Sequence, residues 1–314
     1  MANYRGLNAV ASYERKDEST SEVFHENSKM KRIDGVSWGK RFEAIRANKH
    51  VVEAMSKTYK TYPNNESIEL DRDFELTKQS FEEVLLTRRT IREYSGESIT
   101  LKELSKILYF SYGITISFKA FESHGIFFHS QDYIQGVDAI DTLLVNGGYQ
   151  GFRAPASAGG LYPLEIYPVI KKVDGIDPGI YHYNVREHKL EVLRKGDFSK
   201  ELADLTFNQD WQNDAAVYFV VTALFDRTRF KYYERGYRFV LIDAGHMMEN
   251  LYLVSNSLEL GAAAIGGYYD DDMDKFLGID GINEATVYLS LVGKLVKDSD
   301  VLKKSRLILN KEND

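Results

Sequence analysis

Four short segments of the sequence are suited to holding a cofactor or moving a proton. The first is the run 88–92, in which Arg88, Arg89 and Arg92 surround Thr90. Guanidinium groups and a hydroxyl can converge on a phosphate through charge-assisted hydrogen bonds. Basic residues are also favoured at a helix C-terminus by the macrodipole, so the cluster alone indicates a helix end more readily than a phosphate site.

The second and fourth segments are rich in small residues. Residues 153–163 have the sequence RAPASAGGLYP and precede a predicted strand, and residues 261–267 end in Gly266 and Gly267. Small side chains let the backbone approach a flat ligand closely, with its amides available for hydrogen bonds. A tight turn explains residues 153–163 equally well, and packing against a helix explains residues 261–267. The first of these segments is neither a Rossmann fingerprint nor a P-loop.

The third segment, residues 225–238, interleaves cationic and aromatic side chains between a predicted buried strand and a predicted buried helix. A solvated loop is the usual explanation for such cations, but the aromatic residues fit it less well. Apolar surroundings and neighbouring cations lower the pKa of a lysine. Lys231 is therefore the candidate base, and Tyr232 is the candidate proton donor or relay.

No metal site is predicted. His246 and Glu249 have the spacing H-x-x-E, but the second histidine of the zinc helix motif is missing, and a buried histidine held by hydrogen bonds is commoner. The acidic run 270–272 suits a helix start, because the glycine and glutamate spacing of an EF-hand is missing. Cysteine does not occur in the 314 residues, which excludes disulfides, thiolate catalysis and Cys-ligated metals.

The composition is that of a globular protein with a sizeable core, since 43% of the residues are hydrophobic and 13% are aromatic. The formal charge of −7 argues against a broad nucleic-acid-binding face. The first residues lack the apolar core of a signal peptide, and no run reaches the length of a membrane span. We expect a cytoplasmic protein without nucleic-acid or membrane partners.

Periodicity predicts the elements that must position the four segments. Helices are expected around Phe81, after the capping-box pair Thr100 and Glu103, and over 237–260. Strands are predicted over 164–173, 262–267 and 285–294, and residues 179–185 and 189–193 are predicted to form a hairpin. The apolar run 215–225 is predicted to be a central strand. Together they predict an α+β fold with a mixed central sheet flanked by helices.

Two regions lie outside this pattern. Residues 1–75 are more polar and are expected to form an N-terminal region that docks a partner or peptide, or covers the sheet, while residues 76–314 form the main domain. Residues 114–152 mix aromatic residues and glycines with weak periodicity, which suggests a lid or an irregular insertion.

Taken together and in this order, the four segments resemble the FMN-dependent nitroreductase superfamily, and more closely its SagB-type branch of azoline dehydrogenases. The resemblance covers about residues 74–296. Two motifs are typical of that branch: ASAGGLYPLEIY at 156–167, and KYYERGYR at 231–238, which continues into DAGH at 243–246. The run 88–92 alone indicates only a nitroreductase-like protein.

The resemblance implies a nitroreductase-like FMN-binding fold and a homodimer with FMN at the subunit interface. It implies cofactor contacts from Arg88, Arg89, Thr90, Arg92 and Lys294 to the phosphate and ribityl chain, from Pro155, Ala156 and Ser157 to the isoalloxazine ring, and from Gly266 and Gly267 near its reactive edge. Lys231 and Tyr232 match the catalytic Lys-Tyr pair of the branch. Tyr233 stands where glycine is expected, a departure that would narrow the pocket or alter its substrate.

The implied reaction oxidises a thiazoline or oxazoline of a cyclised precursor peptide to a thiazole or oxazole, in the maturation of a ribosomally made peptide. Lys231 would remove a ring proton, hydride would pass to the flavin, and dioxygen is the expected acceptor. A peptide groove along 110–152 and a partner cyclodehydratase complex are also implied. Two alternatives stay open: an NAD(P)H-dependent nitro or quinone reductase, and a flavin-free scaffold that binds peptide within a biosynthetic complex.

Overall fold

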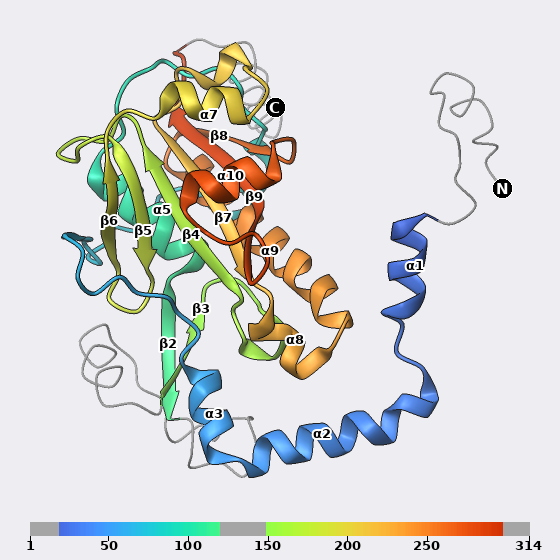
Figure 1. Cartoon of the computed structure of the whole chain (residues 1–314). Coiled ribbons are helices and arrows are strands. Elements are labelled where there is room, and N and C mark those ends of the chain that lie inside the picture. The colour runs from blue at the N-terminus through green and yellow to red at the C-terminus, as the bar shows by residue number, and fades with distance from the viewer. Residues whose placement is uncertain (1–18, 120–148, 298–314) are drawn as a thin grey trace, which may run out of the picture.

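An antiparallel sheet of seven strands forms the centre of the protein (Figure 1). The structure is a computed structural model, and it describes residues 19–119 and 149–297. In sheet order the strands are β1 (Ser67–Glu69), β6 (Lys189–Lys195), β5 (Gly179–Asn184), β4 (Leu164–Ile170), β7 (Val217–Leu224), β9 (Glu284–Lys294) and β8 (Leu260–Ile265). Every strand predicted from the sequence lies in this sheet, and the predicted α+β class is confirmed.

The predicted central strand is β7, which pairs with β4 on one side and β9 on the other. Phe219 and Val221 lie in the core on one face of the sheet, and Tyr218 and Val220 lie in the core on the opposite face. Successive side chains of a strand point to opposite faces, so a strand covered on both sides must be apolar almost throughout. The prediction of a central strand is confirmed.

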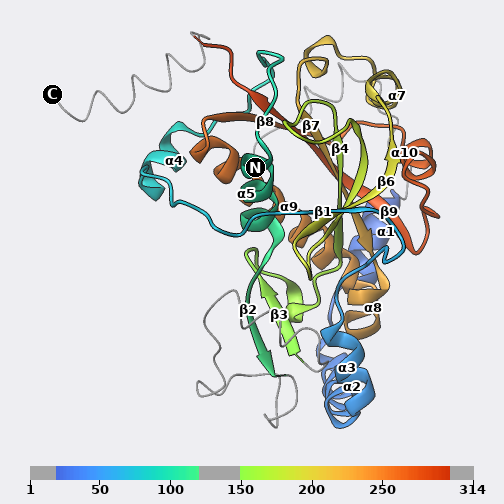
Figure 2. The same ribbon diagram turned by 90° about the vertical axis from the view of Figure 1, so that its left-hand side faces the viewer.

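Helices cover both faces of the sheet, as Figure 2 shows. Helices α5 (Leu101–Tyr112) and α9 (Arg235–Ser257) pack on one face, and α7 (Ser199–Leu205) and α10 (Asp270–Leu277) pack on the other. The predicted capping box is present at α5, and α4 (Phe81–Thr87) begins with a second one. Within the described ranges, no helix has the length and apolar character needed to cross a membrane.

The expected mixed sheet is corrected in one respect, because all neighbouring strands pair antiparallel. The connection through α9 does make β7 and β8 run in the same direction, but β9 lies between them and pairs antiparallel with both. Among the described residues, parallel pairing is limited to single bridges at Thr90–Ala262 and Ile99–Val173.

The described part of the N-terminal region contains α1 (Thr20–Asn27), a 3-10 turn η2 (Arg32–Asp34), α2 (Gly35–Ala47) and α3 (Lys49–Ser56). Helices α2 and α3 lie at one end of the molecule beside the short helix α8 (Asp226–Tyr232) (Figures 1 and 2). The following strand β1 joins the edge of the main sheet. The division of the chain at residue 75 stays a prediction.

A separate two-stranded ribbon, β2 (Ile114–Lys119) with β3 (Tyr149–Arg153), begins the stretch for which a lid or insertion was expected. Most of that stretch, residues 120–148, lies outside the described residues, as do 1–18 and 298–314. Two further short 3-10 turns are η3 (Ala158–Gly160) and η4 (Asp210–Gln212).

A chain of buried charges crosses three strands of the sheet and ends on α8. The two ring nitrogens of His182 on β5 donate to Glu191 on β6 (2.9 Å) and to Glu165 on β4 (3.0 Å). Glu165 also forms a 2.6 Å ion pair with Arg227 of α8. His182, Glu165 and Glu191 are at most 2% exposed. Because both nitrogens face carboxylates, His182 is an imidazolium, and two cations balance two anions.

The pKa values agree with this assignment. Burial alone would raise the pKa of Glu165, but Arg227 and His182 outweigh it and lower the pKa to about 2. Burial alone would lower the pKa of His182, but its hydrogen bonds to Glu165 and Glu191 outweigh it and raise the pKa.

Replacing His182 with Gln should lower the free energy of unfolding by about 3 to 5 kcal/mol, because two carboxylates would then face each other without a buried cation between them. Because the pKa of His182 is raised in the fold, its protonation stabilises the folded state fully at pH values below the ordinary histidine pKa of 6.5. This stabilisation is lost as the pH rises through the pKa of His182 in the folded state. Denaturant unfolding across pH should therefore show the largest difference below pH 6.5. The exposed His25→Gln should change the stability by less than about 0.5 kcal/mol; an equal effect of both variants would contradict this account.

Candidate functional site

Lys231 and Tyr232 are the last two residues of α8, the short helix that directly follows the carboxyl end of the central strand β7. Their polar ends pack against Gly159 in the small-residue segment. A Cβ atom on Gly159 would lie 2.5 Å from the Tyr232 hydroxyl oxygen and 2.7 Å from Lys231 Nζ. Gly159 also has φ +65°, so glycine is required here both by space and by conformation. The structure thus brings the candidate catalytic pair and the second segment together.

The N-terminal helix α2 covers this pair with aromatic rings. The ring centroids of Trp38 and Phe42 lie 6.2 Å and 6.1 Å from that of Tyr232, and Lys231 Nζ lies 5.9 Å from the Phe42 ring. Burial raises the pKa of Tyr232, and neighbouring Asp243 raises it further. The Tyr232 hydroxyl therefore stays protonated and can donate a hydrogen bond.

The segment 155–158 is held against α9 by hydrogen bonds. Ser157 Oγ donates to Asp243 (2.5 Å), the Ala158 amide donates to the same carboxylate (3.3 Å), and His246 Nδ1 donates to the Ala156 carbonyl (3.1 Å). Burial raises the pKa of Asp243, partly offset by Ser157. Neither Asp243 nor His246 was among the predicted site residues, although both belong to the DAGH motif and their spacing of three places them on one helix face.

The phosphate-binding candidates lie alongside the beginning of β8. The Ile91 amide donates to the Ala262 carbonyl (2.9 Å), and Thr90 bridges to the same residue. Arg88 Nε lies 3.7 Å from Glu249 of α9, and the Arg92 guanidinium lies 5.8 Å from the Trp211 ring. Thr90 and Arg92 are exposed and Arg88 is partly exposed. These three side chains keep cationic and hydroxyl donors accessible to an anion.

Two other candidates have protein partners. Arg89 donates to the carbonyls of Leu86 (3.0 Å) and Arg88 (2.6 Å), so it caps the end of α4. Lys294, at the end of β9, donates to Glu103 of α5 (2.6 Å). For Arg89 the structure therefore supports the helix-end interpretation of the first segment.

Gly266 and Gly267 are exposed and follow the other end of β8. The five residue steps from Ala262 to Gly267 span up to roughly 17 Å at about 3.4 Å per step of extended chain. On α9, Asp243 lies near the small-residue segment and Glu249 lies near Arg88, about 9 Å further along the helix at about 1.5 Å per residue. The candidate residues are therefore spread along α9 and β8, with the basic donors near one end of these elements and the Lys231–Tyr232 pair near the other.

The basic donors at one end and the small-residue segment at the other fit an elongated mononucleotide with a phosphate and a flat ring. Among the residues that the structure describes, no group of three or more histidine, aspartate and glutamate side chains is arranged to hold a metal ion. His246 instead donates to a backbone carbonyl.

Tyr233, the departure from the expected glycine, has φ +49° and ψ −141°. This region of backbone space is strained for a residue with a Cβ atom. Its side chain is anchored by α2, because Arg41 donates to the Tyr233 hydroxyl (2.8 Å) and Trp38 packs edge-on against the ring (5.7 Å). Arg41 also donates to the Phe230 carbonyl of α8. The strained residue is thus the point where the N-terminal region docks on the candidate catalytic helix.

The fold is that of nitroreductases. A crystal structure of a nitroreductase-family protein from Anabaena variabilis superposes with a TM-score of 0.62 at 22% identity, covering 92% of this chain and 48% of that chain. The Escherichia coli microcin synthetase complex, solved with a truncated pro-peptide bound, contains a chain that superposes with a TM-score of 0.51 at 16% identity, covering 86% of this chain and 99% of that one.

The nitroreductase family model matches residues 85–294, and this chain belongs to the nitroreductase family. A nitroreductase-like relative from Methanocaldococcus jannaschii is 31% identical over 69% of this chain and 91% of its own length. The trifolitoxin-processing protein TfxB of Rhizobium leguminosarum is 29% identical over 43% of this chain, and the microcin B17-processing protein McbC of Escherichia coli is 26% identical over 52%. The chain covers 38% and 63% of the lengths of these last two proteins.

Two substitutions at Tyr233 separate its backbone strain from its side-chain contacts. Tyr233→Gly and Tyr233→Ala both remove the ring, but only Ala keeps a Cβ atom at φ +49°. We expect the Gly variant to be more stable than the Ala variant by about 1 kcal/mol, because relief of the strain exceeds the entropic cost of glycine. Urea unfolding measures the difference. An Ala variant as stable as the Gly variant would show that this backbone is unstrained.

Proposed function

We propose that the chain is an FMN-dependent dehydrogenase that oxidises thiazoline or oxazoline rings of a cyclised precursor peptide to thiazoles or oxazoles. The observation that supports this most directly is the packing of the Lys231 amino group and the Tyr232 hydroxyl against Gly159. A base and a hydroxyl donor beside a small-residue segment suit proton removal from a ring stacked near a flat cofactor. Similarity to proteins that process microcin B17 and trifolitoxin supports a role in peptide maturation.

FMN is the proposed cofactor, as is general in the nitroreductase family. Its phosphate would be held by the accessible donors Arg88, Thr90 and Arg92, with Arg89 and Lys294 adding positive charge nearby. The isoalloxazine ring would lie along Pro155, Ala156 and Ser157, with Gly266 and Gly267 near its reactive edge. The domain that provides these residues is the proposed main domain, 76–314.

Oxidation of an azoline to an azole removes one proton and one hydride from the ring. Lys231 would take the acidic ring proton at Nζ. Tyr232, whose pKa is raised by burial, would remain protonated and donate a hydrogen bond to the substrate. FMN, when bound, supplies the two-electron acceptor, with dioxygen as the final acceptor. The Trp38 and Phe42 rings would exclude water from the pair.

A homodimer is part of the proposal. Leu241 and Ile242 on α9 are 45% and 51% exposed, and Phe81 on α4 is 63% exposed. Exposed large apolar side chains favour an interaction with another protein surface. A second copy of this chain would cover them. The proposed further partners are the cyclised precursor peptide and a cyclodehydratase complex, by analogy with the peptide-bound microcin synthetase complex. Residues 1–75 would provide the docking region for these partners.

An NAD(P)H-dependent reductase of nitro or quinone compounds is the second candidate, and it is favoured by the similarity to the Methanocaldococcus relative. It would use the same cofactor residues and would not require Lys231. A flavin-free scaffold is less well supported, because the accessible donors at Arg88 and Arg92 would then have no function. Purified protein that is colourless and does not take up FMN would favour the scaffold.

Replacing Arg88 with Ala should weaken FMN binding by at least about tenfold, since a hydrogen bond to a charged group contributes about 1.5 to 3 kcal/mol. Flavin fluorescence quenching measures the affinity. Arg89→Ala is the matched control from the same segment, and its effect should be smaller because Arg89 already caps α4. Equal affinities of the wild type and Arg88→Ala would contradict the proposed phosphate site.

Replacing Lys231 with Ala should lower the rate of azole formation by about 10²- to 10⁴-fold, as expected for loss of a general base, while FMN remains bound. Mass spectrometry of a thiazoline peptide follows the reaction, and flavin absorbance reports the cofactor. Lys275→Ala, which removes a 74% exposed lysine of α10, serves as the control and should oxidise the peptide normally. Normal oxidation by Lys231→Ala would show that Lys231 is not the base.

A further inference from the structure

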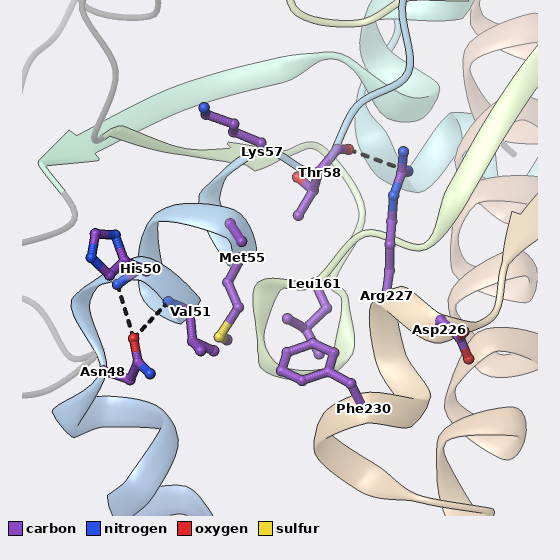
Figure 3. Close-up of a pocket in the computed structure, with 11 residues that line it drawn as sticks. Asn48, His50, Val51, Met55, Lys57, Thr58, Leu161, Asp226, Arg227 and Phe230 are labelled. Atoms are coloured by element: carbon purple, nitrogen blue, oxygen red, sulfur yellow. Dashed lines mark hydrogen bonds between the residues drawn. The ribbon is translucent and has the colours of Figure 1, made fainter.

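A cavity of about 500 Å³ lies between α3 and α8 (Figure 3). Its walls are apolar: Val51 and Met55 come from α3, Leu161 follows the small-residue segment, and Phe230 comes from α8. Cavities of roughly 300 to 1,000 Å³ typically hold small ligands. The volume here is large enough for a bulky side chain together with part of its backbone.

The cavity and the proposed catalytic pair share two wall segments. Phe230 immediately precedes Lys231 on α8, and Leu161 follows two residues after Gly159, on which Lys231 and Tyr232 pack. Leu161 is 1% exposed, and it belongs to a small apolar cluster that includes Met55, Phe230 and Tyr232. If the azoline ring of a bound peptide lies at Lys231, the cavity would therefore lie beside the peptide residue next to that ring.

The charges around the cavity favour an uncharged occupant. Its one deeply placed cation, Arg227, is balanced by the 2.6 Å ion pair with Glu165 and also donates to the carbonyls of Thr58 (3.5 Å) and Tyr162 (3.4 Å). Figure 3 shows the Thr58 contact at one side of the cavity. The other lining residues with ionisable side chains, His50, Lys57 and Asp226, are exposed, and Lys57 and Asp226 are opposite in sign. A buried anion or cation in the occupant would thus have no unbalanced partner.

We propose that this cavity binds a large apolar side chain, aliphatic or aromatic, of the substrate residue adjacent to the ring that is oxidised. This inference rests on the proposed azoline dehydrogenase function and adds a substrate preference to it. Since α3 supplies much of the wall, the N-terminal region selects the peptide, and the nitroreductase fold supplies the chemistry.

The test compares two thiazoline peptides that differ only in having Leu or Gly next to the ring. The wild type should have a kcat/KM at least about tenfold higher for the Leu peptide, because even one methylene group in an apolar pocket discriminates by about tenfold or more. Ala54 lines the cavity and its side chain is exposed, so Ala54→Trp fills the cavity without disturbing the core. This variant should reduce the Leu/Gly ratio to about one.

Ala44→Trp is the matched control, since Ala44 is an exposed residue of α2 outside the cavity, and it should keep the ratio of the wild type. Val51→Trp provides a second way to fill the cavity, and flavin absorbance with an unfolding curve verifies that each variant is folded. A wild-type ratio near one, or a ratio unchanged by both filling substitutions, would overturn the cavity assignment alone. Failure of the wild type to oxidise either peptide would overturn the proposed function and this inference with it.

Discussion

The ion pair between Arg227 and Glu165 is the interaction on which the candidate site depends. A carboxylate on β4, the neighbour of the central strand β7, holds the first turn of α8, and His182 and Glu191 complete a buried charge chain across the sheet. Lys231 lies four residues after Arg227, so the two side chains project from the same face of the helix. Fixing Arg227 therefore orients the face of α8 from which Lys231 extends. A buried pair of this kind adds little net stability but strongly penalises any arrangement that breaks it.

The other constraint on the site comes from the N-terminal region. Arg41 and Trp38 hold the strained Tyr233, and Trp38 and Phe42 cover Tyr232. Helix α3 continues this contact and closes the cavity beside α8. The nitroreductase family match begins at residue 85, so these contacts come from outside the matched part of the chain. In the proposed function, substrate selection and catalysis therefore belong to different regions of the chain, which meet on the seven-residue helix α8.

Sequence patterns predicted the fold well because its core strands and long helix are locally encoded. The apolar run 215–225 is a strand covered on both faces, and the Thr100–Glu103 pair caps a helix as expected. The buried chain of Glu165, His182 and Glu191 could not be predicted, since each residue looks like a polar position in a separate strand until the sheet is assembled. Antiparallel pairing was missed for a similar reason: the order of strands depends on β9 inserting between β7 and β8. The sequence motifs predicted that Lys231, Tyr232 and the small-residue segment belong to one site, and the structure brings them together. The contacts of α2 with this site join segments far apart in the sequence, and no local pattern indicates them.

In the proposed reaction, electrons leave an azoline ring and enter a flavin held by this chain. Anaerobic titration of the FMN-loaded protein with a thiazoline peptide, in the absence of NAD(P)H, follows this transfer. We expect the flavin absorbance to bleach as the peptide loses two hydrogens and to return when air is admitted. A flavin that stays oxidised with the peptide but bleaches with NADPH would exclude an azoline dehydrogenase and identify a reductase.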